Sequence, residues 1–302
     1  MGAKVLLVGI NSYPTMPLRG CINDIENMRA LLSNQYQLGD EALQILRDDE
    51  ATTAAIEDKL RWLAQPDDGD GPPVRLFHFS GHGTYVVDRN GDEPDGRDEA
   101  LVPYDYDQSG AMTDDALRDV YNQFAPETHL LLTMDCCHSG TITRNIAEDI
   151  TYRFLPNSLD EQLQFDEAAQ RVQAERNAYI REQLRDLRGQ SVSEDEWDRR
   201  FQEAATRFDK KHFGVDKLRG NVVLIAACRA DQTAADARIG GNFTGAFTYY
   251  LTEVLRERGQ GITYHDLIGE VGQRLYANHF LQVPQLECSA ANQECNFINI
   301  TL

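Results

Sequence analysis

Two stretches of the sequence decide the fold: Val74–Thr84, which reads VRLFHFSGHGT, and His129–Gly140, which reads HLLLTMDCCHSG. Each begins with a predicted strand, Val74–Phe79 and His129–Met134, whose continuous apolar content is typical of a strand buried on both faces of a parallel sheet. Each run ends in a loop that holds glycine beside histidine or cysteine. In open parallel sheets, ligands bind outside the carboxyl ends of the strands. We therefore predict a mostly parallel α/β sheet with a functional site where these two strands end.

Apolar runs and amphipathic segments alternate along the rest of the chain, as in a parallel sheet covered by helices. Further strands are predicted at Lys4–Ile10, Ala42–Leu46 and Val222–Ala227, with a last one from Pro284–Glu287 and Phe297–Ile300. Helices are predicted at Asn23–Leu32, Ala54–Leu63, Asp115–Phe124, Gly245–Arg256 and Tyr264–Leu275.

A charged stretch from about Ala147 to Arg219 interrupts this pattern. It is dense in Glu, Asp, Arg and Gln, and Leu159–Leu187 and Glu194–Phe208 have helical periodicity. Long insertions of this kind are usually functional or mobile. We predict one α/β domain in two parts, residues 1–146 and 220–302, separated by a helical insertion at 147–219. The alternative is that the insertion is only a solvated helical hairpin that caps the domain.

The composition excludes several classes of function. With 29 basic and 49 acidic side chains in 302 residues, the net charge is −20. This argues against nucleic acid or an anionic membrane as partner, and favours basic partners or cations. Six cysteines are too few for a disulfide scaffold, the first apolar run is too short for a signal peptide, and no 18-residue apolar span occurs. We expect a soluble, cytoplasmic protein.

His82 and Cys137 are the candidate base and nucleophile. Each follows one of the two central strands, and the two residues are 55 positions apart in the sequence. Glycines beside them let a substrate approach the backbone. His138 is adjacent to Cys137, and neighbouring strand residues point to opposite faces, so His82 is the better base. A metal or redox site is the alternative, but the Cys-x-x-Cys spacing usual for such sites is missing.

The chain resembles the caspase-like peptidases, and among them the metacaspases and their bacterial relatives, the orthocaspases. Seven motifs along nearly the whole chain carry the resemblance: Leu18–Asp24, Phe79–Gly83, Asp95–Asp105, Asp135–Gly140, Ala227–Ala234, Gly245–Tyr249 and Pro284–Leu286. The insertion falls outside the match. The resemblance implies a three-layer caspase-like fold around a mostly parallel six-stranded sheet.

By this resemblance the nucleophile is Cys137 and the base is His82. Cys137 attacks the substrate carbonyl, His82 exchanges a proton with it and with the leaving amine, and water resolves the acyl-enzyme. The glycine placement suggests that backbone N–H groups at Gly83 and Cys137 stabilise the oxyanion.

The resemblance also implies an acidic pocket for the residue before the scissile bond, made by Asp24, Ser80 and Asp135, with Cys21 alongside. Two buried carboxylates favour a guanidinium, which pairs with both. We therefore expect cleavage after Arg, less well after Lys, and none after Asp. For Asp24 alone, the alternative is a carboxylate that stabilises a helix N-terminus.

A calcium site is a second implication of the resemblance. Asp98 and Glu99 match two of the family's calcium ligands, but Arg144 occupies the position of a further acidic ligand. We expect that no cofactor is required, with Ca²⁺ at Asp98 and Glu99 as the alternative.

The position of the insertion suggests how the peptidase is controlled. It lies where caspase-like chains join their large and small segments, and residues 144–219 carry many Arg and Lys side chains. We predict a zymogen restrained by this linker and activated by self-cleavage, or by an upstream protease, at an undetermined Arg or Lys. The alternatives for the whole chain are a catalytically silent interaction scaffold and a related protease with another pocket preference.

Overall fold

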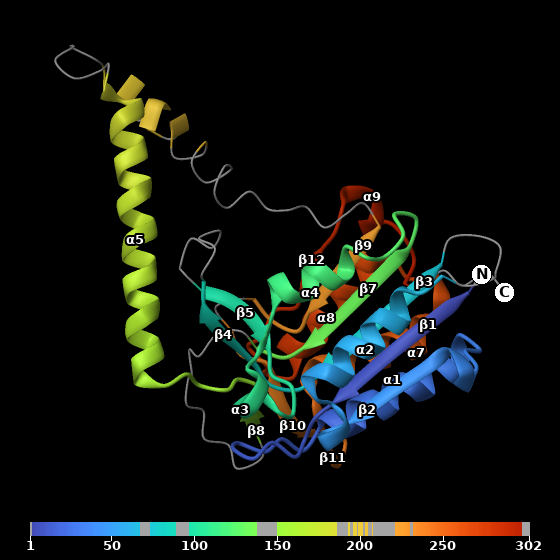
Figure 1. The fold of residues 1–302 in the computed structure, drawn as a ribbon. Helices are drawn as coiled ribbons and strands as arrows, with labels where there is room; N and C mark the ends of the chain where they lie inside the picture. Colours follow the sequence, from blue (N-terminus) through green and yellow to red (C-terminus); the bar gives the residue numbers. More distant parts are fainter. Residues whose placement is uncertain are drawn as a thin grey trace. The chain divides into compact units, whose positions relative to one another are not determined.

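A six-stranded sheet forms the centre of the structure, a computed structural model that describes residues 2–66, 73–88, 97–137, 150–185, 221–229 and 232–297 and some positions between 193 and 207 (Figure 1). The strand order is β12-β9-β7-β3-β1-β2. The strands are β1 (Ala3–Gly9), β2 (Leu43–Arg47), β3 (Val74–Ser80), β7 (His129–Asp135), β9 (Val222–Ala226) and β12 (Gln285–Glu287).

All neighbouring strands of this sheet are parallel except β12, which pairs antiparallel with β9. The prediction of a mostly parallel sheet is thus confirmed. The register pairs Gly9 with Ser80 and Ser80 with Asp135, so β1, β3 and β7 end at the same edge. β3 is buried at every position, as its continuous apolar run predicted.

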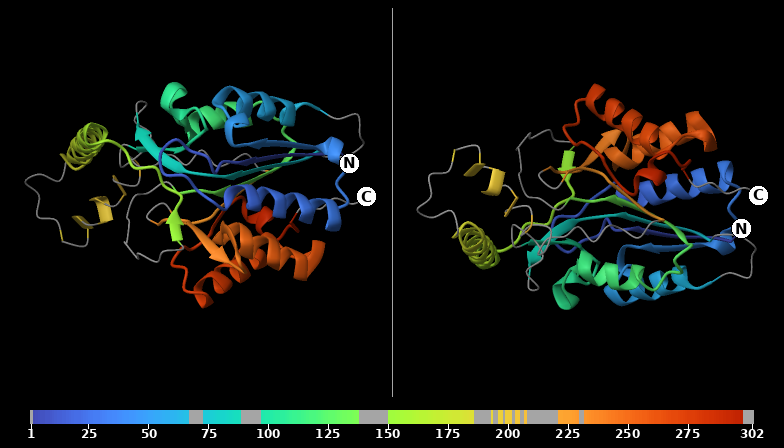
Figure 2. Two further views of the ribbon diagram at one scale, coloured as in Figure 1. Left: turned by 90° about the horizontal axis from the view of Figure 1, so that it is seen from below. Right: turned by 90° about the horizontal axis from the view of Figure 1, so that it is seen from above.

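Helices cover both faces of the sheet (Figure 2). One face carries α1 (Cys21–Gln35), α7 (Ala246–Arg258) and α8 (Tyr264–Ala277), and the other carries α2 (Thr53–Ala64) and α4 (Asp114–Tyr121). The short helices α3 (Tyr106–Ser109) and α9 (Ala290–Gln293) complete this part of the chain. Threonines begin α2, α4 and α8, where each side chain accepts the N–H of the third residue along. This hydrogen bond satisfies one of the donors that a helix start leaves free.

Short strands that the sequence analysis did not predict make two small sheets. One has the order β4-β5-β6, from β4 (Gly83–Val87), β5 (Arg97–Leu101) and β6 (Met112–Thr113). The other has the order β11-β10-β8, from β8 (Ile150–Tyr152), β10 (Ala235–Ile239) and β11 (Asn242–Gly245). A two-residue turn, Gly240-Gly241, joins β10 to β11 with φ of 61° and 94°. Those values favour glycine.

The chain divides into two compact units. The first holds residues 1–84, 100–156 and 217–302, and the second holds residues 85–99 and 157–216. In the second unit, α5 (Leu159–Gln183) is the main helix, and Ile180 and Leu184 pack with Ala204 in a small apolar cluster. Within the described residues, no helix combines the length and the apolarity needed to cross a membrane.

The predicted last strand is shorter than expected. Only Gln285–Glu287 forms a strand, because the buried Phe297 lies in a turn. Positions 298–300 lie outside the described residues.

Candidate active site

The loops after β3 and β7 lie side by side because their strands are paired to the last residue. The packing is so close that a Cβ atom on Gly83 would lie 2.0 Å from the carbonyl oxygen of Cys137. Only glycine fits at this position, which explains the Gly-His-Gly sequence. The site that we predicted at these strand ends therefore brings His82 and Cys137 into one neighbourhood.

His82 is held in one tautomer. Its side chain is fully buried, and Nε2 lies 2.7 Å from the carbonyl oxygen of Met16. A carbonyl can only accept, so Nε2 carries the proton and Nδ1 has the lone pair. Among the residues that the structure describes, Nδ1 has no hydrogen-bond partner. Burial lowers the pKa of His82 to about 4, although the bond to Met16 opposes this shift. The imidazole is therefore a neutral base with Nδ1 free to accept a proton.

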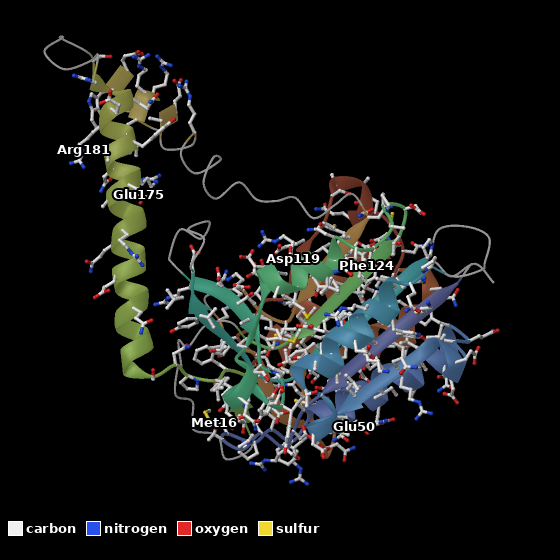
Figure 3. All side chains as sticks on the ribbon, in the orientation of Figure 1. Met16, Glu50, Asp119, Phe124, Glu175 and Arg181 are labelled. Atoms are coloured by element: carbon white, nitrogen blue, oxygen red, sulfur yellow. The ribbon has the colours of Figure 1, made fainter. Side chains whose placement is uncertain are left out.

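Two residues of the loop between β1 and α1 position this histidine, and the sequence analysis missed both. The Tyr13 hydroxyl donates to the carbonyl of Val102 (2.8 Å) and accepts the backbone N–H of His82 (3.0 Å). The Tyr13 ring lies 4.6 Å from the imidazole. Met16 adopts the left-handed backbone conformation, with φ of 54°, and its side chain is exposed (Figure 3). A non-glycine residue rarely adopts this conformation, so the loop holds the Met16 carbonyl at some cost.

Cys137 and Cys136 point to different surroundings. Cys136 belongs to the hydrophobic core, whereas Cys137 Sγ contacts the backbone of Ala234, accepting its N–H and lying 3.5 Å from its carbonyl oxygen. Among the described residues, no hydrogen bond joins Cys137 Sγ to His82. The two neighbouring thiols thus lie in different environments, and the choice of Cys137 as nucleophile stays a prediction. All six cysteines are free.

The predicted acidic pocket contains a guanidinium from the same chain, that of Arg153. Nη1 donates to Ser80 Oγ (2.7 Å) and lies 3.2 Å from Asp135 Oδ1. Nη2 donates to Asp24 Oδ2 (2.6 Å) and to Asp236 Oδ1 (3.1 Å). All five side chains are almost completely buried. The structure thus brings Asp24, Ser80 and Asp135 together as predicted, and adds Asp236, which the sequence analysis missed.

The pocket is strongly acidic even with Arg153 inside it, because three carboxylates surround one cation. Burial alone would lower the pKa of Arg153, but the carboxylates raise it well above its ordinary value. Burial also raises the pKa of Asp135 to about 6, with Arg153 opposing the shift and Asp24 adding to it. The pocket therefore has a strong preference for a positively charged occupant.

Backbone and hydroxyl donors fix these carboxylates. Thr248 donates to Asp135 Oδ2 from its N–H (3.0 Å) and its hydroxyl (2.6 Å). Gly245 N–H donates to Asp24 Oδ1 (2.9 Å), and a Cβ atom on Gly245 would lie 2.2 Å from Asp135 Oδ2. Hydrogen bonds from α7 and from Gly245, the last residue of β11, thus hold Asp135 and Asp24 in place.

Cys21, the fourth predicted pocket residue, is the first residue of α1 and is fully buried. Burial raises the pKa of its thiol, so it adds no charge beside the carboxylates.

The N–H groups that were predicted to stabilise the oxyanion donate to an acceptor within the same chain. The N–H groups of Gly83 and Cys137 both point at the backbone carbonyl oxygen of Arg153, at 2.9 and 3.2 Å. The carbonyl of Ala234 accepts the Arg153 N–H at 3.1 Å. One residue therefore occupies the acidic pocket with its side chain and the predicted oxyanion position with its carbonyl.

The predicted calcium ligands belong to the second of the two compact units. Asp98 is buried and Glu99 is exposed, both in β5. Arg144 and His138 lie outside the described residues. Among the residues that are described, no three His, Cys, Asp or Glu side chains are grouped as metal ligands.

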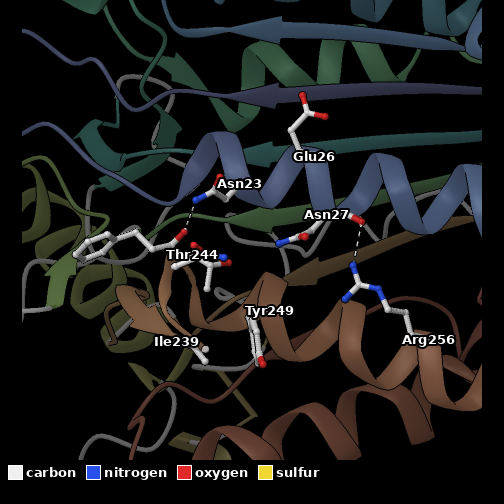
Figure 4. Close-up of a pocket in the computed structure, with 10 residues that line it drawn as sticks. Asn23, Glu26, Asn27, Ile239, Thr244, Tyr249 and Arg256 are labelled. Atoms are coloured by element: carbon white, nitrogen blue, oxygen red, sulfur yellow. Dashed lines mark hydrogen bonds between the residues drawn. The ribbon is translucent and has the colours of Figure 1, made fainter.

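A separate cavity of about 230 Å³ lies between α1, β11 and α7 (Figure 4). Its lining is mixed, and in it Asn23 donates to the Phe243 carbonyl (2.7 Å) and Arg256 to the Asn27 carbonyl (3.4 Å). Neither His82 nor Cys137 lines it.

Comparison with known proteins defines the class. A family model described as the caspase domain of peptidase C14 matches residues 3–295, and the chain belongs to this family of cysteine peptidases. Among curated proteins it is 32% identical over 301 residues to metacaspase-1A of Aspergillus fumigatus, covering 95% of this chain and 68% of the relative. It is also 32% identical to metacaspase-1A of Aspergillus niger (95% and 70%) and to metacaspase-1 of Eremothecium gossypii (95% and 64%). The chain is thus of the metacaspase type, and these relatives are fungal.

Solved structures agree on the fold. A Geobacter sulfurreducens protein matches with a TM-score of 0.61 at 23% identity, over 97% of both chains. Caspase-1 of Spodoptera frugiperda matches with a TM-score of 0.53 at 11% identity, over 95% of this chain and 86% of the other. The predicted caspase-like fold is confirmed.

Proposed function

We propose that the chain is a cysteine endopeptidase that cleaves after arginine, and more slowly after lysine, with Cys137 as nucleophile and His82 as base. The observation that carries the specificity is the guanidinium of Arg153 among Asp24, Asp135 and Asp236. A pocket that holds one arginine side chain in this way offers the same contacts to the arginine of a substrate.

The preference for arginine over lysine follows from how the contacts are divided. Nη1 of Arg153 contacts Ser80 and Asp135, while Nη2 contacts Asp24 and Asp236. A planar guanidinium reaches both pairs at once, whereas an ammonium is a single point charge. Lysine therefore keeps the charge but loses part of the hydrogen bonding. An aspartate would add a fourth carboxylate to three, which the pocket excludes.

The chemistry follows from the tautomer of His82. Nδ1 accepts the thiol proton of Cys137, and Sγ attacks the carbonyl carbon of the substrate arginine. The negative charge that develops on the carbonyl oxygen is stabilised by the N–H groups of Gly83 and Cys137, which already point at that position. His82 then protonates the leaving amine, and water hydrolyses the thioester. A positioned base of this kind contributes about 10²–10⁴-fold to the rate.

Peptides that differ only before the scissile bond test the proposal, with Arg, Lys, citrulline and Asp at that position. Citrulline has the shape of arginine without its charge. We expect kcat/KM to fall in the order Arg, Lys, citrulline, with no cleavage after Asp and none by the Cys137→Ala variant. Preference for Asp would contradict the pocket assignment. Absence of labelling of Cys137 by a peptidyl-arginine electrophile would favour the interaction scaffold.

A further inference from the structure

We infer that the Arg153–Phe154 peptide bond is the chain's own first substrate, held across the active site before it is cut. This inference rests on the proposed function and adds the bond, the register and the intramolecular route. It starts from the backbone of residues 150–155, which pairs with β10 before Arg153 and with Gly83 after it.

The residues before the bond extend a sheet. Ile150, Thr151 and Tyr152 form β8 and pair antiparallel with Ala237, Asp236 and Ala235 of β10. Adding a strand to the edge of a sheet is a common way to bind an extended peptide, because backbone hydrogen bonds hold it whatever its side chains. Arg153 continues this pairing, with its N–H donated to the Ala234 carbonyl at 3.1 Å.

The residues after the bond follow β4. Phe154 forms a parallel bridge with Gly83, and the Leu155 N–H donates to the Gly83 carbonyl at 2.9 Å. The Thr84 hydroxyl donates to the Leu155 carbonyl at 2.9 Å. Phe154 is 4% exposed. The segment is therefore bound on both sides of the Arg153–Phe154 bond, as a protease holds its substrate.

Three independent contacts single out this bond. The Arg153 side chain fills the acidic pocket, its carbonyl oxygen faces the Gly83 and Cys137 N–H groups, and its N–H pairs with the residue that contacts Cys137 Sγ. The other described arginines of the insertion differ: Arg171, Arg181 and Arg185, for example, are exposed. Arg171 and Arg181 lie within α5, where a helical peptide bond cannot extend along the cleft.

The step balances without a co-reactant other than water. The Cys137 thiol proton moves to His82 Nδ1 while Sγ bonds to the Arg153 carbonyl carbon. The bond from that carbon to the Phe154 nitrogen breaks, and the nitrogen takes the proton from His82. Water then adds to the thioester and restores the thiol. The products are residues 1–153, ending in a carboxylate, and residues 154–302, beginning with an amine.

The bond also regulates the site. While residues 150–155 remain in place, the pocket and the oxyanion position are both occupied, so no second peptide can bind there. Cutting the bond separates the two halves of the segment, so that residues 150–153 can leave the pocket and the oxyanion position. The proposed enzyme is therefore closed to other substrates until it has cut itself.

The test compares wild type, Cys137→Ala, Arg153→Gln, Arg153→Lys and, as matched control, Arg181→Gln, with fragments identified by intact mass and N-terminal sequencing. We expect a new N-terminus at Phe154 in wild type and Arg181→Gln, none in Cys137→Ala, and at least 100-fold slower release in Arg153→Gln. Arg153→Lys keeps the positive charge and is expected to be cut at the same bond about 10-fold more slowly, which guards against misfolding of the glutamine variant. The first-order rate should not change with protein concentration.

Three outcomes overturn the inference: a first cut at another bond, a rate proportional to protein concentration, or cleavage of an added arginyl peptide by wild type whose Arg153–Phe154 bond stays intact. The last result would leave the proposed peptidase function standing. If wild type cuts neither itself nor any arginyl peptide, the proposed function itself fails.

Discussion

Replacing Arg153 by alanine measures how much the free energy of unfolding depends on the cation in the acidic pocket. The variant is made in the Cys137→Ala background, so that both chains stay intact. In the parent, the guanidinium lies 2.6, 3.2 and 3.1 Å from carboxylate oxygens of Asp24, Asp135 and Asp236. Removing one partner of a buried ion pair costs about 3–5 kcal/mol, because the charge left behind has neither a partner nor water. We expect the free energy of unfolding to fall by that amount at pH 7.

Urea unfolding followed by circular dichroism gives the difference from the shift of the midpoint, provided that the slope is unchanged. The control is Arg185→Ala, since Arg185 pairs with Glu182 at 3.3 Å but both side chains are mostly exposed. Such a surface change is worth at most about 0.5 kcal/mol. If Arg153→Ala costs no more than this control, the guanidinium is not in the pocket, and the inference about the Arg153–Phe154 bond loses its basis.

The pH dependence of this stability loss and the effect of a guanidinium ligand test the same pocket further. The pKa of Asp135 is raised to about 6 even with Arg153 present, so the folded state holds this proton more tightly than the unfolded chain does. Such a carboxyl stabilises the folded state when it is protonated, so its contribution increases as the pH falls through its pKa in the folded protein. The loss caused by Arg153→Ala should therefore be larger at pH 8 than at pH 5. Agmatine, which has a free guanidinium, should stabilise the variant, by about 2.7 kcal/mol at 100 times its Kd, and leave the parent unchanged.

Three further predictions concern the reaction. Asp236→Asn removes one carboxylate from the pocket and should lower kcat/KM for arginyl peptides about 10- to 100-fold, as expected for the loss of a charge-assisted hydrogen bond. The control variant Asp107→Asn changes an exposed carboxylate and should have no effect. Because burial lowers the pKa of His82 to about 4, the rate of self-cleavage should fall only below about pH 4–5; a midpoint near 6.5 would contradict the buried neutral base. Tyr13→Phe leaves the His82 N–H without its acceptor and should reduce kcat about 10-fold with little change in KM; an equal rise in KM would instead indicate a role in substrate binding.

The main sheet could be predicted because its strands are long and buried. Val74–Ser80 and His129–Asp135 show continuous apolar runs, and both were predicted to within one residue. The strands of the two small sheets were missed because each has only two to five residues. One local signal was present: Gly240-Gly241 is a two-residue glycine turn of the kind that joins hairpin strands, and it joins β10 to β11.

The site was predictable where side-chain type carries the chemistry. The position of His82 and Cys137 after buried strands led to both, and the family resemblance led to Asp24 and Asp135. Asp236 was missed because it lies in β10, a strand that was not predicted. Its distance from Asp24 in sequence gives no indication that the two meet. Met16 acts through its carbonyl, which every residue has, so no residue pattern could identify it.

The sequence analysis treated Arg153 only as one of many basic residues in the insertion. Its place in the pocket shows that this one arginine differs from the others in its surroundings. Three buried carboxylates around one cation leave the pocket two charges short of neutrality. An empty pocket would hold the carboxylates together without water, so folding favours a state in which a cation is already present. The chain supplies that cation itself, from a residue 16 positions after Cys137. The electrostatics that we propose to select arginine in a substrate thus also favour an internal arginine while the protein folds. If the Arg153–Phe154 bond is cut as we infer, the pocket depends on its next occupant, and the cut protein should be more stable with an arginine-ended peptide bound than without one.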